Sequence, residues 1–192
     1  MNLPNKLTLF RVFLVPIFVV LLLNNFKGWS LFVFCLASFT DFLDGYLARK
    51  NNLITNFGKF MDPLADKLLV CSALVVLTYM NKVNIFITLV IIAREFIISG
   101  VRLIAAEKGN VIAASYWGKF KTVSQMIGII LSIITINFNW FPSVDPSYSA
   151  PHISYIIFDL SGNIVMWVAC ALTIISLIDY LIKNKDIFKG EM

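Results

Sequence analysis

Residues 41–67 read DFLDGYLARKNNLITNFGKFMDPLADK and interrupt a chain that is otherwise strongly apolar. The stretch holds four aspartates, one arginine and three lysines, whereas the 192-residue chain as a whole is 59% hydrophobic and only 14% charged. An apolar run lies on each side of it, and each run has nearly the length of about 20 residues that a helix needs to cross a bilayer. We therefore expect the acids to lie where two membrane helices end.

Long apolar segments recur along the whole chain. The mean hydropathy of +0.83 and the 59% apolar content exceed the roughly 45–50% typical of soluble domains. The segments that we interpret as spans cover residues 7–24, 29–48, 62–80, 84–105, 121–138 and 160–182. The prediction is one all-α integral membrane domain over residues 1–192, with a short amphipathic N-terminal segment and six transmembrane helices.

The distribution of lysine and arginine predicts the orientation of this domain. A six-span topology puts Lys27 and Lys82 on one side, Arg94 within a span and the other basic residues on the opposite side. By the positive-inside rule, that opposite side, with both termini and the acid-rich stretch, faces the cytosol. No basic stripe with interleaved aromatic residues indicates a nucleic-acid partner. The +5 net charge instead favours contact with membrane lipids.

The four aspartates are spaced in two pairs. Asp41 and Asp44 are three residues apart and Asp62 and Asp66 are four apart, so each pair shares one face of a helix. Pro63 belongs either to the first turn of a helix that Asp62 caps or to a kink in a longer helix. A single aspartate at a helix end is usually a solvated cap, but four close carboxylates repel one another.

Divalent cations would relieve this repulsion. Ligands that are all oxygen select a hard ion such as Mg²⁺, Mn²⁺ or Ca²⁺. Four carboxylates can hold two ions, which is the arrangement used for in-line phosphoryl displacement. The pairs therefore predict a two-metal site at the cytosolic ends of the second and third spans.

Eight residues of this stretch stand at fixed spacing and read Asp41-x2-Asp44-Gly45-x2-Ala48-Arg49-x8-Gly58-x3-Asp62-x3-Asp66. This motif resembles the signature of the CDP-alcohol phosphatidyltransferase family, and the six-span topology is similar too. The resemblance implies transfer of a substituted phosphate from a CDP-linked lipid to an alcohol, with release of CMP. It also implies two Mg²⁺ or Mn²⁺ ions on the four aspartates, Asp66 as the catalytic base, and a homodimer. The residues that it assigns to CDP-diacylglycerol are Asn5, Thr8, Asp44, Gly45, Ala48, Arg49 and Gly58.

Basic residues outside the motif suggest which alcohol is used. The runs IIAREFIISGVRL (91–103) and GKFKTVSQ (118–125) place several cations in or near the fourth and fifth spans. Ionisable groups inside a membrane are functional candidates. Arg94 and Glu95 are adjacent and point in different directions, so they are not an obvious mutual pair. Buried pairing with other spans is the alternative to a functional role. The expected contacts of an anionic acceptor are Lys59, Arg94, Arg102, Lys119 and Lys121.

The same two runs resemble those of bacterial phosphatidylglycerophosphate synthases, whose acceptor is sn-glycerol 3-phosphate. This resemblance implies a location in the bacterial cytoplasmic membrane. Two alternatives stay open at this point. One is an enzyme of the same family that uses inositol phosphate or phosphatidylglycerol as the acceptor. The other is a divalent-cation transporter, although transport sites tend to lie nearer the midplane of the membrane. The outer connection at residues 139–159 suggests no function.

Overall fold

The chain is described by a computed structural model over residues 3–24, 26–50, 56–107, 115–138 and 153–184. Some side chains within these ranges lie outside the described part: those of residues 3–5, 27, 41–60, 62, 63, 66, 106, 107 and 154. The described elements are α1 (Leu3–Leu23), α2 (Lys27–Lys50), α3 (Asn56–Tyr79), α4 (Ile85–Glu107), α5 (Tyr116–Phe138) and α6 (Ile153–Lys183). The prediction of an all-α chain is confirmed for these residues.

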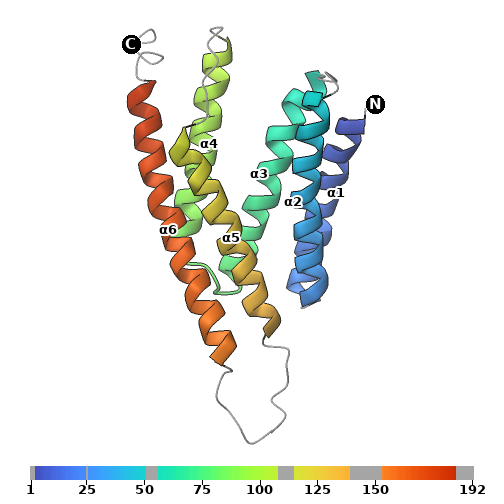
Figure 1. The fold of residues 1–192 in the computed structure, drawn as a ribbon, viewed down its shortest axis with the longest axis vertical. Helices are drawn as coiled ribbons and strands as arrows, with labels where there is room; N and C mark the ends of the chain where they lie inside the picture. The colour runs from blue at the N-terminus through green and yellow to red at the C-terminus, as the bar shows by residue number, and fades with distance from the viewer. Residues whose placement is uncertain (1–2, 25, 51–55, 108–114, 139–152, 185–192) are drawn as a thin grey trace, which may run out of the picture. The chain divides into compact units, whose positions relative to one another are not determined.

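The first of two compact units contains α1, α2 and α3, and it consists of residues 1–80 and 133–149. Helix α1 packs against both α2 and α3 (Figure 1). The rings of Phe18 and Phe34 are fully buried at the α1–α2 contact, with their centroids 5.4 Å apart. Leu74 and Leu77 of α3 are also fully buried. Aromatic and aliphatic burial of this kind holds the three helices together.

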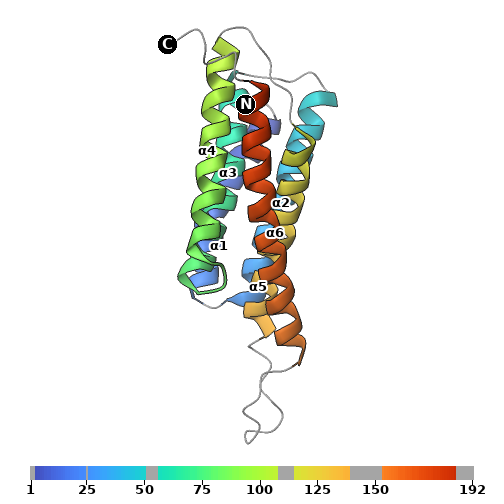
Figure 2. The same ribbon diagram turned by 90° about the vertical axis from the view of Figure 1, so that its left-hand side faces the viewer.

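The second unit consists of residues 81–132 and 150–192, and so contains α4, most of α5 and α6. Helices α4 and α6 lie side by side (Figure 2). Their contact includes Ile98, Val101 and Tyr180, which form one buried cluster. Helix α5 approaches α6 at Gly128, where a Cβ atom would lie 2.5 Å from the Sδ atom of Met166. Glycine is therefore the residue that this close approach allows.

The outward faces of the helices are apolar. Phe13, Phe39 and Leu89 are each more than half exposed. Among the described residues, three helices are long and apolar enough to cross a membrane, over Lys6–Leu23, Tyr116–Ile136 and Tyr155–Lys183. Such surfaces suit contact with lipid rather than with water.

The helices extend beyond several of the predicted spans. Helix α3 begins at Asn56, whereas the apolar pattern begins at residue 62, so Pro63 lies inside a longer helix. Helix α1 runs unbroken from Leu3 through Pro16, so the predicted amphipathic segment and the first span form one helix. Hydropathy does not mark these helix ends because their first turns are polar.

A tight turn joins α3 to α4. Asn81 has a φ of 57°, which is the left-handed region that asparagine tolerates better than most residues do. The side-chain oxygen of Asn84 accepts a hydrogen bond of 2.8 Å from the backbone N–H of Phe86 and so caps α4. Next to these residues, Lys82 donates hydrogen bonds to Tyr155 and Asp159 at 2.8 and 3.0 Å. The turn is thereby attached to the first turns of α6.

Candidate functional site

The predicted metal ligands lie on two helices of the first unit. Helix α2 carries Asp41 and Asp44, and α3 carries Asp62 and Asp66. Because both segments are helical, spacings of three and four residues place each pair on one face of its helix. The side chains of all four lie outside the described part, as do those of Gly45, Ala48, Arg49, Gly58 and Lys59. The two-metal site therefore stays a prediction.

The donor set fits hard divalent cations, because it consists of carboxylate oxygens on two helices that belong to one compact unit. Among the side chains that the structure describes, no group of three or more histidine, cysteine, aspartate or glutamate residues could hold a metal ion. This finding does not concern the four aspartates, because they are not among those side chains.

The N-terminal helix contributes two buried polar residues to the first unit. Thr8, which was predicted to lie near the nucleotide, is fully buried, and the side chain of Asn5 falls outside the described part. Arg11 lies three residues after Thr8 on the same face of α1 and is fully buried as well. A buried guanidinium needs a counter-charge. Arg11 was not predicted as a site residue, although an arginine inside an apolar run is a signal for one.

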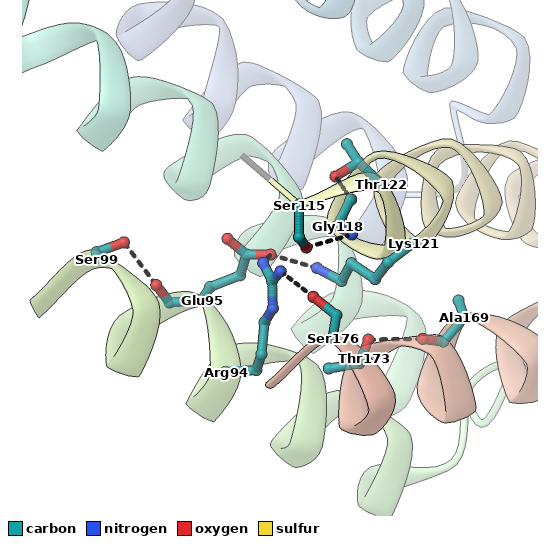
Figure 3. Close-up of polar contacts among 10 residues, drawn as sticks. All are labelled: Arg94, Glu95, Ser99, Ser115, Gly118, Lys121, Thr122, Ala169, Thr173 and Ser176. Atoms are coloured by element: carbon teal, nitrogen blue, oxygen red, sulfur yellow. Dashed lines mark hydrogen bonds and ion pairs between the residues drawn. The ribbon is translucent and has the colours of Figure 1, made fainter. Parts of the chain in front are cut away.

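The second unit contains a polar network, which we define as Arg94 and Glu95 of α4, Lys121 of α5 and Ser176 of α6 (Figure 3). The Nη1 atom of Arg94 lies 3.3 Å from the Oε1 atom of Glu95. Its Nη2 atom donates a hydrogen bond of 2.6 Å to the hydroxyl of Ser176. The Nζ atom of Lys121 is ion-paired with the same Oε1 atom of Glu95.

This geometry corrects one expectation. Arg94 and Glu95 were not an obvious mutual pair, because neighbouring residues on a helix point in different directions, and pairing with other spans was the alternative. They do form an ion pair. Both side chains are long enough to bend toward each other, and Glu95 also pairs with Lys121 of α5.

The start of α5 packs closely on this network. The hydroxyl of Ser115 accepts a hydrogen bond of 3.1 Å from the backbone N–H of Gly118 and so caps the helix. A Cβ atom on Gly118 would lie 3.2 Å from the Nη2 atom of Arg94 and 3.3 Å from the Oγ atom of Ser115. A hydrogen atom at this position therefore makes room for the guanidinium.

Two of the predicted acceptor residues stand over aromatic rings. Arg102 is exposed, and its guanidinium stands over the ring of Tyr180 with 5.9 Å to the centroid. Lys119 is also exposed, 5.4 Å from the centroid of the Tyr116 ring. Of the predicted acceptor contacts whose side chains are described, the network thus contains Arg94 and Lys121.

The network can attract an anion. Arg94 and Lys121 carry two positive charges against the single negative charge of Glu95, so the formal sum is +1. The Nε atom of Arg94 is buried and has no hydrogen-bond partner among the described residues. An unpaired buried donor costs about 1–3 kcal/mol.

Comparison with known proteins agrees with the motif. Residues 1–175 match the family model for CDP-alcohol phosphatidyltransferase. A protein of Bacillus subtilis is 39% identical over 206 residues, which cover 98% of this chain and 97% of that protein. A Rickettsia typhi protein is 37% identical over 97% of this chain and 99% of its own length. A Salmonella typhimurium protein is 39% identical over 94% of this chain and 93% of its own. All three are named CDP-diacylglycerol–glycerol-3-phosphate 3-phosphatidyltransferase.

Proposed function

Because this chain belongs to the CDP-alcohol phosphatidyltransferase family, we propose that it transfers the phosphatidyl group of CDP-diacylglycerol to sn-glycerol 3-phosphate. The products are phosphatidylglycerophosphate and CMP, which makes the protein an enzyme of phospholipid biosynthesis. The observation that carries this proposal is the similarity to relatives of that name over nearly the full length of both chains. The cationic network of the second unit supports an acceptor that bears a phosphate.

The proposed setting is the cytoplasmic membrane of a bacterium. All six helices cross the bilayer in this proposal, with the active site at the cytosolic ends of α2 and α3. The bias of lysine and arginine supports that orientation. The apolar outward faces of the helices support lipid contact. We also propose a homodimer, on the family resemblance alone.

Two divalent cations, Mg²⁺ or Mn²⁺, would be held by Asp41, Asp44, Asp62 and Asp66. When bound, such ions would neutralise the charge of the diphosphate and align the attacking and leaving oxygens. The support for this assignment is the chemistry of the donors, which are four carboxylates spaced in pairs on α2 and α3.

The donor lipid binds the first unit in this proposal, with its acyl chains in the bilayer. Arg49 holds the diphosphate, since a planar guanidinium can donate to two phosphate oxygens at once. Gly45 lets the nucleotide approach the backbone of α2 closely. The remaining proposed contacts are Asn5, Thr8, Asp44, Ala48 and Gly58.

The acceptor enters from the cytosol. Its phosphate is held by cations drawn from Lys59, Arg94, Arg102, Lys119 and Lys121. Asp66 removes the proton from the primary hydroxyl, whose oxygen attacks the lipid-proximal phosphorus. The bond from that phosphorus to the CMP oxygen breaks, and CMP leaves. A base in this role contributes typically ~10²–10⁴-fold to the rate.

The test measures transfer of label from radioactive glycerol 3-phosphate into lipid that partitions into organic solvent. Purified protein in detergent receives CDP-diacylglycerol and Mg²⁺, with EDTA as the control. Metal-dependent incorporation with release of CMP is expected. CMP release only with inositol phosphate or phosphatidylglycerol would contradict the acceptor and keep the family chemistry. A folded protein that releases no CMP with any acceptor would favour the transporter.

A further inference from the structure

Helix α6 carries two buried hydroxyl groups whose hydrogen bonds differ. Thr173 and Ser176 are both fully buried and lie three residues apart. The hydroxyl of Thr173 donates a hydrogen bond of 2.6 Å to the carbonyl of Ala169 in its own helix. The hydroxyl of Ser176 instead accepts a hydrogen bond of 2.6 Å from Arg94 of α4 (Figure 3). Only the second of these two contacts joins different helices.

The guanidinium of Arg94 is held from two sides. Glu95 contacts its Nη1 atom and Ser176 accepts from its Nη2 atom, while the Nε atom has no partner within the described part of the chain. The side chain of Arg94 is 10% exposed, so it stays near the protein surface and yet is mostly shielded from water. A guanidinium fixed at two of its nitrogen atoms keeps its positive charge in one place, which favours an anionic oxygen beside it.

Packing restricts the guanidinium further. A Cβ atom on Gly118 would lie 3.2 Å from the Nη2 atom of Arg94 and 3.7 Å from the Oγ atom of Ser176. Residues of α4, α5 and α6 therefore meet at this one group. Holding a long side chain in a single geometry before the ligand arrives removes an entropy loss that binding would otherwise incur.

We propose that Ser176 is a positioning residue, which fixes the Arg94 guanidinium for the phosphate of the acceptor. This inference rests on the proposed function, and it makes α6 part of the acceptor site. Ser176 lies far outside the aspartate motif, and its contact with Arg94 spans 82 residues of sequence. Its effect should therefore fall on the acceptor and not on CDP-diacylglycerol.

The experiment compares Ser176→Ala with Thr173→Ala, a matched control that removes a buried hydroxyl from the same helix without touching Arg94. Steady-state transfer is measured while each substrate is varied in turn. Ser176→Ala should raise KM for glycerol 3-phosphate about tenfold, the equivalent of one hydrogen bond to a charged group, and leave KM for CDP-diacylglycerol unchanged. Thr173→Ala should change neither KM. Ser176→Cys keeps the size of the side chain with a weaker acceptor, and it should also raise KM for glycerol 3-phosphate.

Two results would overturn the inference. One is a KM for glycerol 3-phosphate in both Ser176 variants that equals that of Thr173→Ala. The other is a parallel rise of KM for both substrates in all three variants, which would indicate a general packing defect. In either case, the wild-type protein still incorporates label from glycerol 3-phosphate. A folded wild-type protein that incorporates none would overturn the proposed function, and this inference with it.

Discussion

Lys121 of α5 is ion-paired with Glu95 of α4, and the lysine side chain is only 1% exposed. A buried ammonium is tolerated because a carboxylate offsets its charge. The same carboxylate oxygen also contacts Arg94. Glu95 therefore contacts both cations of the polar network and offsets part of their charge.

Replacement of Glu95 by Gln should destabilise the protein, because it removes the carboxylate that contacts two buried cations. We expect the free energy of unfolding to fall by about 3 kcal/mol, which is the lower end of the range for breaking a buried ion pair. For a chain of this size, that corresponds to roughly 6–12 °C in the apparent melting temperature, measured in detergent.

Asp179→Asn is the matched control for Glu95→Gln. Asp179 pairs with Lys183 at 2.7 Å on α6, but that lysine side chain is 66% exposed. An exposed pair contributes about 0–1 kcal/mol, so the melting temperature should change little. Equal shifts in the two variants would contradict the role of Glu95 as a buried counter-charge.

Replacement of Gly118 by Ala should weaken acceptor binding. The added Cβ atom would lie 3.2 Å from the Nη2 atom of Arg94, so the guanidinium must move by a few tenths of an ångström. Overpacking that costs about 1 kcal/mol corresponds to roughly a fivefold rise in KM for glycerol 3-phosphate. The measurement is steady-state transfer with each substrate varied.

Gly100→Ala serves as the control for this change. Gly100 lies within α4, and a Cβ atom there would meet nothing within 4 Å. Alanine has the higher helix propensity, so this variant should gain about 0.5–1 kcal/mol in stability and keep its KM values. A KM that is unchanged in Gly118→Ala would show that the guanidinium has room to move.

The sequence predicted the helices better than it predicted their ends. Apolar runs mark the buried and lipid-facing parts, because each such helix needs one long apolar stretch. The first turns of α3 are polar, so its start at Asn56 lies six residues before the predicted span. Propensity and hydropathy carry little information at such ends, where tertiary contacts decide whether the helix continues.

The candidate site was predictable in part, for a similar reason. Arg94 and Lys121 stand out because cations are rare in apolar segments. Ser176 does not stand out, because serine is common in membrane helices. Its hydrogen-bond partner, Arg94, is 82 residues away in the sequence. The pairing of Arg94 with Glu95 was missed because the directions of adjacent Cβ atoms say little about where long side chains end.

Replacement of Asp66 by Asn should reduce transfer by about 10²–10⁴-fold, because the amide cannot accept the proton of the acceptor hydroxyl. The rate of label incorporation at saturating substrates is the measurement. Asp159→Asn on α6 is the control, since Asp159 pairs with Lys82 and lies outside the motif. A rate within a few-fold of wild type in a folded Asp66→Asn protein would exclude Asp66 as the base.

The turn between α3 and α4 should make the stability of the protein fall at high pH. Lys82 lies in this turn, outside the predicted spans. Burial acts to lower the pKa of Lys82, but hydrogen bonds to Tyr155 and Asp159 outweigh it, and the pKa is raised above its ordinary value of 10.5. A raised pKa means that the folded state holds the proton more tightly than the unfolded state does. The contribution of Lys82 to stability is thus complete below pH 10.5 and is lost as the pH rises through the higher folded pKa.

Comparison with Lys82→Met isolates this effect from other groups that titrate at high pH. Methionine keeps most of the side-chain volume but cannot carry the charge. Below pH 10 the free energy of unfolding of the wild type should exceed that of the variant by about 0.5–1 kcal/mol. The gain is small because the ion pair is only partly buried, with side-chain exposures of 16% for Lys82 and 35% for Asp159. The difference in apparent melting temperature should shrink as the pH rises above 10.5 and through the higher folded pKa of Lys82. A difference that stays constant from pH 8 to the alkaline limit would show that Lys82 acts through packing of its alkyl chain and not through its charge.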